Sequence, residues 1–258
     1  RVHLVPREGG EWVAVALEPR KRVLVHPPVA NVDRILSVVT LKDPVLDEVW
    51  LNRMLVGAEA LGFPVTVVIN KADLLTAEDR RWMERRYGPL GYPLRFVSAR
   101  TGDGLDALRK EIGQDIVVLA GPSGVGKTSL LNRLLGKDML PVGELSQKTR
   151  RGRHTTSEVR LLRLPDGGYV ADTPGFSQIR LGEWMEPADL DRYFPEFQPY
   201  LPCAFRDCTH HEEPGCNIRA AVERGEIPAF RLDFYHQFRE ELVAYLAWKR
   251  KKRSGRIR

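Results

Sequence analysis

Two stretches of the chain decide its fold: Gly121-Pro122-Ser123-Gly124-Val125-Gly126-Lys127-Thr128 and, earlier in the sequence, Asn70-Lys71-Ala72-Asp73. The first has the form G-x-x-x-x-G-K-[ST], in which the backbone N–H groups of a glycine-rich turn and the N-terminus of the following helix cradle phosphates. Such a loop needs a strand before it and a helix after it. The hydrophobic pattern predicts a strand over residues 115–120 and a helix over residues 127–135, so this requirement is met.

The polar residues of the phosphate loop have distinct expected roles. The Lys127 ammonium should pair with the β- and γ-phosphates, and the Thr128 hydroxyl should bind Mg²⁺. A chance glycine-rich turn is the alternative, and the match over the full motif argues against it. The expected phosphate-binding residues are Gly121, Pro122, Ser123, Gly124, Val125, Gly126, Lys127, Thr128 and Ser129.

The stretch N-K-x-D predicts which base is bound. The Asp73 carboxylate can accept hydrogen bonds from guanine N1–H and the 2-amino group, whereas adenine offers neither donor and would leave the carboxylate unpaired. Asn70 and Lys71 complete the motif, and a backbone N–H of Ser98-Ala99, at the next predicted strand end, would reach guanine O6. The alternative for the motif alone is an ordinary Asx turn. Asp73 disfavours a metabolic ATPase or kinase, and Asp73→Asn should shift the preference toward xanthosine nucleotides.

A third motif, Asp172-Thr173-Pro174-Gly175, has the form D-x-x-G and follows the second strand of a predicted hairpin. Asp172 is expected to hold Mg²⁺, directly or through water, and the Gly175 N–H to sense the γ-phosphate. The position after this motif, where GTPases commonly place a water-orienting Gln, is Phe176. A phenyl ring cannot polarise water, so intrinsic hydrolysis should be slow unless another residue acts.

The segment between the phosphate-loop helix and the hairpin carries the candidate catalytic residues. His154 is the nearest substitute for the missing Gln, because imidazole titrates near neutral pH, and a solvated loop residue is the alternative. Thr155 and Thr156 are both candidates for the switch threonine that completes Mg²⁺ coordination, and the sequence does not choose between them.

All these motifs follow predicted strands, which is where open α/β sheets bind their ligands. In Ras-like GTPases the phosphate loop precedes the base-recognition motif, whereas here it follows. We therefore expect an α/β fold with a circularly permuted P-loop GTPase domain over residues 33–180 and a mostly parallel sheet with one antiparallel hairpin edge. Strands are predicted at 34–40, 65–69, 94–97, 115–120, 158–164 and 168–171, and helices at 44–61, 76–87, 105–112 and 127–135.

The flanking regions have a different character. Residues 1–32 contain two short apolar runs separated by a predicted turn, which indicates a small β element. Residues 181–258 show no strand pattern and contain two helical stretches, at 218–224 and 230–252. Most aromatic side chains of the second stretch are expected to pack in the core.

The region after residue 180 holds every cysteine of the chain, in the array Cys203-x₄-Cys208-x-His210-x₅-Cys216. Three thiolates and an imidazole make a closed tetrahedral Zn²⁺ site with no open position, so the metal should be structural. His211 competes with His210 for the fourth position, and three unrelated buried thiols are the alternative. An odd number of closely spaced cysteines argues against disulfides and favours a reducing compartment.

Composition places the chain among soluble proteins. It has 258 residues, 43% hydrophobic and 29% charged, with a formal net charge of +6. No apolar run approaches the roughly 20 residues of a membrane span, and residues 1–6 are too short and polar for a signal peptide, so the cytoplasm is expected. Basic clusters at residues 148–153 and 249–253 suit a polyanionic partner, although a solvated helix end is the alternative for the second.

Taken together, residues 121–132 (GPSGVGKTSLLN), 151–158 (RGRHTTSE), 172–176 (DTPGF), the preceding NKAD and the Cys/Cys/His/Cys array closely resemble the ribosome small-subunit-dependent GTPase A family, also called YjeQ or YloQ. The resemblance extends to residues 28–33 (PVANVD) and covers nearly the whole chain. It implies an N-terminal OB-fold, a permuted GTPase domain and a C-terminal zinc domain. Residues 1–32 resemble only the last strands of that OB-fold.

The resemblance also implies a function. Members of this family are bacterial, cytoplasmic GTPases that bind GTP and GDP and act late in maturation of the small (30S) ribosomal subunit, where they bind 16S rRNA and are stimulated by the subunit. A monomer is expected. An RNA-binding module whose nucleotide site only senses GTP is the alternative that Phe176 keeps open. Because residues 172–176 lead directly into the zinc domain, we hypothesise that GTP hydrolysis repositions residues 181–258 relative to the sheet.

Overall fold

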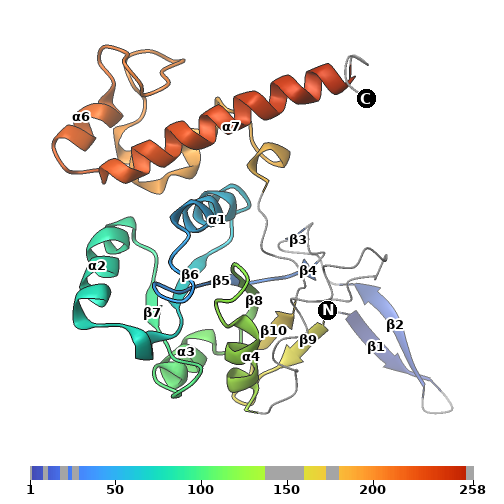
Figure 1. Cartoon of the computed structure of the whole chain (residues 1–258). Helices are drawn as coiled ribbons and strands as arrows, with labels where there is room; N and C mark the ends of the chain where they lie inside the picture. The colour runs from blue at the N-terminus through green and yellow to red at the C-terminus, as the bar shows by residue number, and fades with distance from the viewer. Residues whose placement is uncertain are drawn as a thin grey trace.

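A computed structural model describes residues 2–7, 11–17, 23–24, 29–136, 160–172 and 180–253. Within these residues, six strands form one sheet in the order β7-β6-β5-β8-β10-β9 (Figure 1). The first five are parallel to their neighbours, and β9 pairs antiparallel with β10 at the edge, as the sequence predicts. The strands are β5 (Arg34–Val39), β6 (Val65–Ile69), β7 (Leu94–Phe96), β8 (Ile116–Ala120), β9 (Arg160–Arg163) and β10 (Tyr169–Asp172).

Helices cover both faces of this sheet, because successive strand residues point to opposite sides. On β5, Ile35 and Val39 belong to one core, while Leu36 and Val38 belong to the other. The first core is covered by α1 (Glu48–Ala60) and α2 (Ala77–Tyr87), and the second by α3 (Leu105–Ile112) and α4 (Lys127–Leu135). The predicted helices are therefore confirmed, with one change of boundary.

That change concerns the start of α1, which the sequence places near Pro44. In the structure α1 begins at Glu48, because the Asp47 side chain accepts a hydrogen bond from Trp50 N–H (2.9 Å) and thereby caps the helix. The carbonyl of Pro44 instead accepts a hydrogen bond from Thr40 Oγ1 (2.7 Å). Residues 41–46 thus form a loop beside the strand end of β5.

Residues 180–253 form a mostly helical unit that lies against α1 (Figure 1). Three short 3₁₀ turns that the sequence pattern does not predict come first: η4 (Leu181–Glu183), η5 (Leu190–Tyr193) and η6 (Pro195–Tyr200). Two helices follow, α6 (Asn217–Glu223) and the long α7 (Ala229–Arg253). Tyr235 and Phe238 of α7 are buried, as expected, whereas Trp248 is 45% exposed.

This C-terminal unit and one face of the sheet share a single hydrophobic core. Leu51 and Leu55 of α1 belong to the same buried cluster as Phe194 and Phe238. Arg231 of α7 is fully buried at this junction, where Nη1 donates to Asn52 Oδ1 (2.6 Å) and Nε donates to Glu196 Oε1. The junction is therefore built like a domain interior and contains a buried ion pair, in which Glu196 Oε2 and Arg231 Nη2 have no hydrogen-bond partner among the described residues.

The N-terminal residues form two small antiparallel pairs: β1 (Val2–Pro6) with β2 (Trp12–Leu17), and β3 (Val23–Leu24) with β4 (Val29–Ala30). These pairs agree with the expected β element, while the domain boundaries at residues 32 and 180 stay a prediction. None of the helices in the described part of the chain combines the length and the apolar composition of a membrane span.

Candidate nucleotide and metal sites

The predicted nucleotide-binding stretches meet at one edge of the sheet. Asn70 follows β6 and Gly121 follows β8, and these parallel strands both pair with β5, so their carboxyl ends point the same way. The contact is direct, because Asn70 Nδ2 donates a hydrogen bond of 2.9 Å to the Val125 carbonyl in the phosphate loop. Two motifs separated by two intervening helices in the sequence are thus adjacent in space.

Asn70 also reaches the third stretch, Ser98-Ala99. Its Oδ1 accepts a hydrogen bond of 3.1 Å from Ala99 N–H, and its side chain is almost fully buried. Ala99 N–H, one of the two backbone groups of Ser98-Ala99 that are candidates to reach guanine O6, therefore has a partner in this structure. The buried amide of Asn70 links the base-recognition strand, the loop after β7 and the phosphate loop through its two ends.

Two glycines permit this close packing. A Cβ added at Gly121 would lie 2.3 Å from the Val38 carbonyl oxygen, and one at Gly126 would lie 2.5 Å from Asn70 Nδ2. The Gly126 backbone is also left-handed, with φ 86°, immediately before α4. A side chain at either position would force the phosphate loop away from the strand ends.

Lys127 begins α4 with its ammonium turned back onto the loop. Nζ donates to the carbonyls of Gly121 and Pro122, both at 2.7 Å. Burial lowers the pKa of Lys127 to about 8, since desolvation disfavours the charged form. These two carbonyl oxygens carry only a partial negative charge. A phosphate bound in the loop would offer the Lys127 ammonium a full negative charge. Thr128 and Ser129 lie in the same first turn of α4.

The Asp73 carboxylate lies in the short turn η1 (Ala72–Leu74) after β6 and is engaged at both oxygens. Ser98 Oγ donates to Oδ1, while Arg100 donates to Oδ2 from Nε at 2.9 Å and from Nη2 at 2.7 Å. The Ser98 hydroxyl and then the Arg100 guanidinium hold the pKa of Asp73 below its usual value. This carboxyl is therefore ionised at neutral pH, as an acceptor for guanine N–H groups must be.

The described residues include only part of the remaining predicted site. Asp172 ends β10, the parallel neighbour of β8, so its backbone arrives at the edge where the phosphate loop begins. His154, Thr155, Thr156, Gly175 and Phe176 lie outside the described residues. Their proposed roles in Mg²⁺ binding, γ-phosphate sensing and catalysis stay predictions.

The second candidate site is the cysteine and histidine cluster. The Sγ atoms of Cys203, Cys208 and Cys216 each lie 3.5 Å from His210 Nδ1, and the Cys203 and Cys216 sulfurs are 3.9 Å apart. Around a tetrahedral Zn²⁺ with ordinary bond lengths, sulfur–nitrogen pairs would be separated by about 3.6 Å and sulfur pairs by about 3.8 Å. The four residues fit a zinc ion.

The structure also distinguishes the two neighbouring histidines. His210 is 1% exposed and points Nδ1 at the sulfurs, while His211 is exposed and its ring packs against His236. The other ring nitrogen of His210, Nε2, is buried and lies 3.6 Å from Asp191 Oδ2, beyond hydrogen-bond distance. Burial raises the pKa of the Cys208 thiol to about 12, so cation binding at this cluster must release protons.

Comparison with known proteins decides the family. A model of the RsgA GTPase family matches residues 17–182, well over half of the chain.

The chain belongs to the RsgA GTPase family.

Its relatives in this family are similar over most of their length. The small ribosomal subunit biogenesis GTPase RsgA of Carboxydothermus hydrogenoformans is 45% identical over 242 residues, which cover 93% of this chain and 82% of that protein. The crystal structure of YjeQ from Thermotoga maritima is 38% identical with a TM-score of 0.78, over 94% of this chain and 82% of that one. YloQ, described as a circularly permuted GTPase, is 29% identical with a TM-score of 0.77, over 95% and 79%. The permuted order is therefore a family feature.

Two residues of this RsgA-family site carry no sequence signal, Arg100 and Arg133. Arg133, on α4, donates from Nε to the Ala99 carbonyl (2.9 Å) and from Nη2 to the Arg100 carbonyl (3.1 Å). Neither arginine stands at a motif position, and both contact residues that are distant in the sequence. The contacts of Arg100 and Arg133 are visible only in the folded structure, where α4 lies beside the loop after β7.

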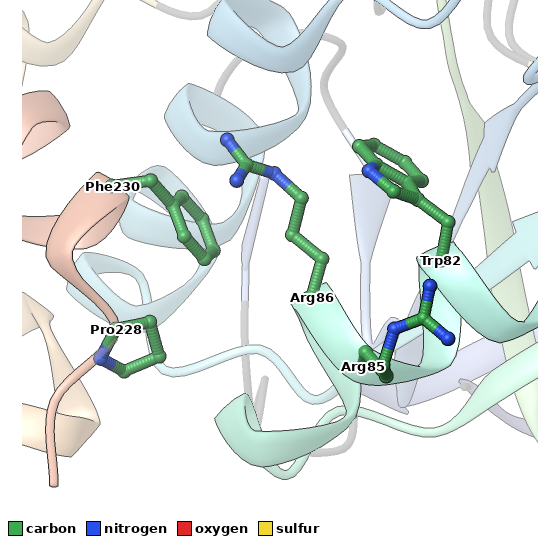
Figure 2. Close-up of a pocket in the computed structure, with 5 residues that line it drawn as sticks. All are labelled: Trp82, Arg85, Arg86, Pro228 and Phe230. Atoms are coloured by element: carbon green, nitrogen blue, oxygen red, sulfur yellow. The ribbon is translucent and has the colours of Figure 1, made fainter. Parts of the chain in front are cut away.

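The RsgA-family chain also has a cavity at the junction of α2 and α7. Its volume is about 300 Å³, and its lining residues, Trp82, Arg85, Arg86, Pro228 and Phe230, include none of the predicted nucleotide-binding residues (Figure 2). The Arg86 guanidinium lies 4.0 Å from the Phe230 ring centre and pairs with both carboxylate oxygens of Glu48, at 2.6 and 2.7 Å. These contacts join α1, α2 and α7, so this cavity belongs to the junction and not to the nucleotide site.

Proposed function

We propose that this chain binds and hydrolyses GTP as a biogenesis factor of the small ribosomal subunit, associating with 16S rRNA. The observation that carries the proposal is the meeting of three separate sequence motifs at one sheet edge, in a chain 45% identical to a small ribosomal subunit biogenesis GTPase. The roles of the other site residues are inferred from the chemistry of GTP hydrolysis.

The guanine base would be selected by the loops after β6 and β7. The ionised Asp73 accepts N1–H and the 2-amino group, while the Ala99 N–H lies beside Asn70 Oδ1, within the loop that would face O6. Asn70 holds both loops to the phosphate loop, so the base and phosphate subsites keep a fixed separation. Adenine offers neither of these donors, so the Asp73 carboxylate would gain no hydrogen bond from the base of ATP.

The phosphates would be held by the loop of residues 121–129. Backbone N–H groups before α4 and the Lys127 ammonium would neutralise the β- and γ-phosphates. Because a bound phosphate is negatively charged, it would raise the pKa of Lys127 from its lowered value. Thr128 and Asp172 would hold Mg²⁺, which when bound offsets the charge that develops on the phosphate oxygens. Gly175 would sense the γ-phosphate, and His154 with Thr155 or Thr156 are our candidates to orient water and complete the metal ligands.

The cysteine cluster would hold one structural zinc ion. Cys203, Cys208, His210 and Cys216 supply four ligands with tetrahedral spacing, which leaves no coordination position for substrate. When bound, zinc would crosslink the loop of residues 203–216 to the start of α6. Its contribution is therefore to folding and not to the reaction.

The far end of α7 supports a polyanionic partner such as rRNA. Residues 249–253 are all basic, and Lys252 lies 5.2 Å from the ring centre of the exposed Trp248. Described acidic residues do not occur beyond Glu241 in this helix. Basic groups at a helix end release counterions on contact with phosphates, so association should weaken as salt rises.

The deciding experiment measures GTP turnover with and without small ribosomal subunits. We expect slow turnover by the chain alone, a large stimulation by the subunits, and loss of both in a Lys127→Ala variant. Arg85→Ala, which removes an exposed arginine that pairs with Glu78 on the surface of α2, is the matched control and should behave as the parent. No turnover in either condition, with GTP still bound, would instead favour an RNA-binding protein whose nucleotide site only senses GTP.

A further inference from the structure

Asp73 has a partner that resembles its expected ligand. The Asp73 side chain is 9% exposed, whereas that of Arg100 is 73% exposed, so an accessible guanidinium covers a nearly buried carboxylate. Arg100 presents two adjacent N–H donors to Asp73 Oδ2, at 2.9 and 2.7 Å. Guanine presents the same kind of edge to this carboxylate, because N1–H and the 2-amino group belong to a guanidine-like N–C–N unit.

The backbone beneath this contact is held in place from both sides. Ala99 N–H is bound by Asn70, and the carbonyls of Ala99 and Arg100 are both bound by Arg133. On the other side, Ala72 N–H donates to the Val97 carbonyl at 2.9 Å, which ties the turn that carries Asp73 to the loop after β7. The part of this region that is free to leave is therefore the exposed side chain of Arg100.

We propose that Arg100 occupies the guanine-recognition carboxylate as an internal mimic of the base, and that it must release Asp73 before a guanine nucleotide can bind. This inference rests on the proposed GTP site and adds a residue that sets its affinity. A molecule in which Arg100 is bound to Asp73 cannot bind the nucleotide. The observed affinity is therefore the intrinsic affinity multiplied by the fraction of molecules in which Arg100 has released Asp73. The same contact keeps Asp73 Oδ2 paired while the site is free of nucleotide.

The sign of the effect separates competition from ordinary electrostatics. Removing a cation near an anionic ligand weakens attraction and slows association. Removing a competitor has the opposite effect. A pair with one exposed partner is worth up to about 1 kcal/mol, so an Arg100→Ala variant should bind GDP about two- to fivefold more tightly, with the gain in the association rate constant.

The test uses the whole chain and fluorescent GDP, with association and dissociation rates followed by stopped flow. Arg100→Ala should associate two- to fivefold faster than the parent, and Arg100→Lys, which keeps the charge but has no two-donor edge, should lie between the two. Arg85→Ala serves as the matched control for loss of an exposed positive charge, and it should not associate faster. Equal or weaker GDP binding by Arg100→Ala would overturn the proposal.

A second pair of variants shows whether the effect passes through Asp73. In the Asp73→Asn background, measured with xanthosine diphosphate, Arg100 has no carboxylate to cover, so adding Arg100→Ala should leave the association rate unchanged. The same gain in this background would overturn the proposal, because it would be independent of Asp73. Failure of the parent chain to bind GDP would contradict the proposed function itself, whereas GDP binding without a gain in Arg100→Ala contradicts only the role of Arg100.

Discussion

The uncharged side chain of Asn70 holds two segments of the nucleotide site together by hydrogen bonds alone. Its amide has a donor and an acceptor, and each is used for a different segment: Val125 in the phosphate loop and Ala99 after β7. Neither an Asp nor a Leu of similar size could make both bonds, because a carboxylate lacks the donor and an alkyl group lacks both. The presence of Asn in N-K-x-D thus has a geometric reason besides recognition of the base.

Asp73 carries the base specificity, and its substitution tests the site most directly. Asp73→Asn replaces an acceptor with an amide that can donate to the 2-oxo group of xanthine. We expect GDP affinity to fall at least tenfold and xanthosine diphosphate to become the preferred ligand, because guanine would lose its charged acceptor. Titration calorimetry with both nucleotides measures the exchange. An Asp73→Asn variant that still prefers GDP would contradict the assignment.

Between elements, Arg133 joins the phosphate-binding helix α4 to the loop after β7. Its two hydrogen bonds go to consecutive carbonyls, at 2.9 and 3.1 Å, and so orient the intervening peptide groups. We expect Arg133→Ala to raise the Kd for GDP about tenfold, since a charged donor with two such bonds is worth about 1.5–3 kcal/mol, part of which is felt in binding. The affinity for inorganic pyrophosphate, which makes no base contacts, should change little.

Arg109 provides the matched control for that prediction. It donates to the Arg133 carbonyl and pairs with Asp106 at 3.0 Å, so it contacts the same helix without contacting residues 99–100. Arg109→Ala should leave the Kd for GDP within about twofold of the parent value. Equal losses in the two variants would mean that Arg133 acts only through the stability of α4.

Helix α2 contains a capping box whose strength depends on pH. Thr76 Oγ1 accepts from Asp79 N–H, and the Asp79 carboxylate accepts from Thr76 N–H and from Lys42. The hydrogen bond from Lys42, followed by those from Thr76, lowers the pKa of Asp79 from 3.8 to about 2. A lowered carboxyl pKa stabilises the fold above about pH 4, and this contribution is lost as pH falls through about 2.

Asp79→Asn should therefore reduce the urea midpoint of unfolding at neutral pH, and its difference from the parent should shrink steadily as the pH is lowered from about 4 to about 2. Urea titrations at several pH values measure both curves. Glu78→Gln is the matched control, because Glu78 is exposed in the same helical turn and takes no part in the capping box. A pH-independent difference for Asp79→Asn would show that the lost bonds do not need the ionised carboxyl.

Elements that depend on local contacts are predictable from the sequence, and those that depend on distant partners are not. The start of α2 follows from Thr76 and Asp79, and the bounds of α4 follow from the motif that ends at Thr128. The turns η4, η5 and η6 have no local pattern, because they pack on other elements: η4 on α7, η5 on α1 and α7, and η6 on η5 and α6. The same reason applies within the site: Asn70 belongs to a motif, while Arg133 is recognisable only from the carbonyls that it reaches.

For the molecule as a whole, the shared core between α1 and residues 181–242 limits how the parts can move. A swing of the C-terminal unit away from the sheet would expose side chains such as Leu51, Phe194 and Phe238, each worth about 1.5–3 kcal/mol on burial. This cost restricts the hypothesis that GTP hydrolysis repositions residues 181–258 relative to the sheet. Any such movement must carry α1 with the C-terminal unit.

Arg231 tests the strength of this junction. Arg231→Ala would leave Glu196 as a buried charge without its partner and Asn52 without a donor, so we expect a loss of about 3 kcal/mol in the free energy of unfolding. Arg53→Ala is the control, because Arg53 crosses the same junction to the partly exposed Glu241 at 2.8 Å and should cost less than about 1 kcal/mol. Denaturant titrations compare the two, and equal losses would contradict the buried ion pair as the stronger tie.

Removal of the metal tests the cysteine cluster. Chelation at neutral pH should leave the three cysteine sulfurs and His210 without the metal that joins them, and the loop of residues 203–216 should lose protection from hydrogen exchange. Because Cys216 belongs to the core shared with α1, protection should also fall at the start of α6 and in α1, while α3 on the opposite face keeps its protection. Unchanged exchange in residues 203–223 after chelation would argue against zinc at this site.

The position of α1 between the sheet and the C-terminal unit has a consequence for synthesis of the protein. Strands β5, β6 and β7 are consecutive in the chain and neighbours in the sheet, so they can pair while the nascent chain is still short. The outer face of α1, however, is covered by residues made more than a hundred positions later. Throughout that interval a newly made molecule presents an apolar helix to solvent, which makes this stage of translation the one most open to chaperone binding and to aggregation.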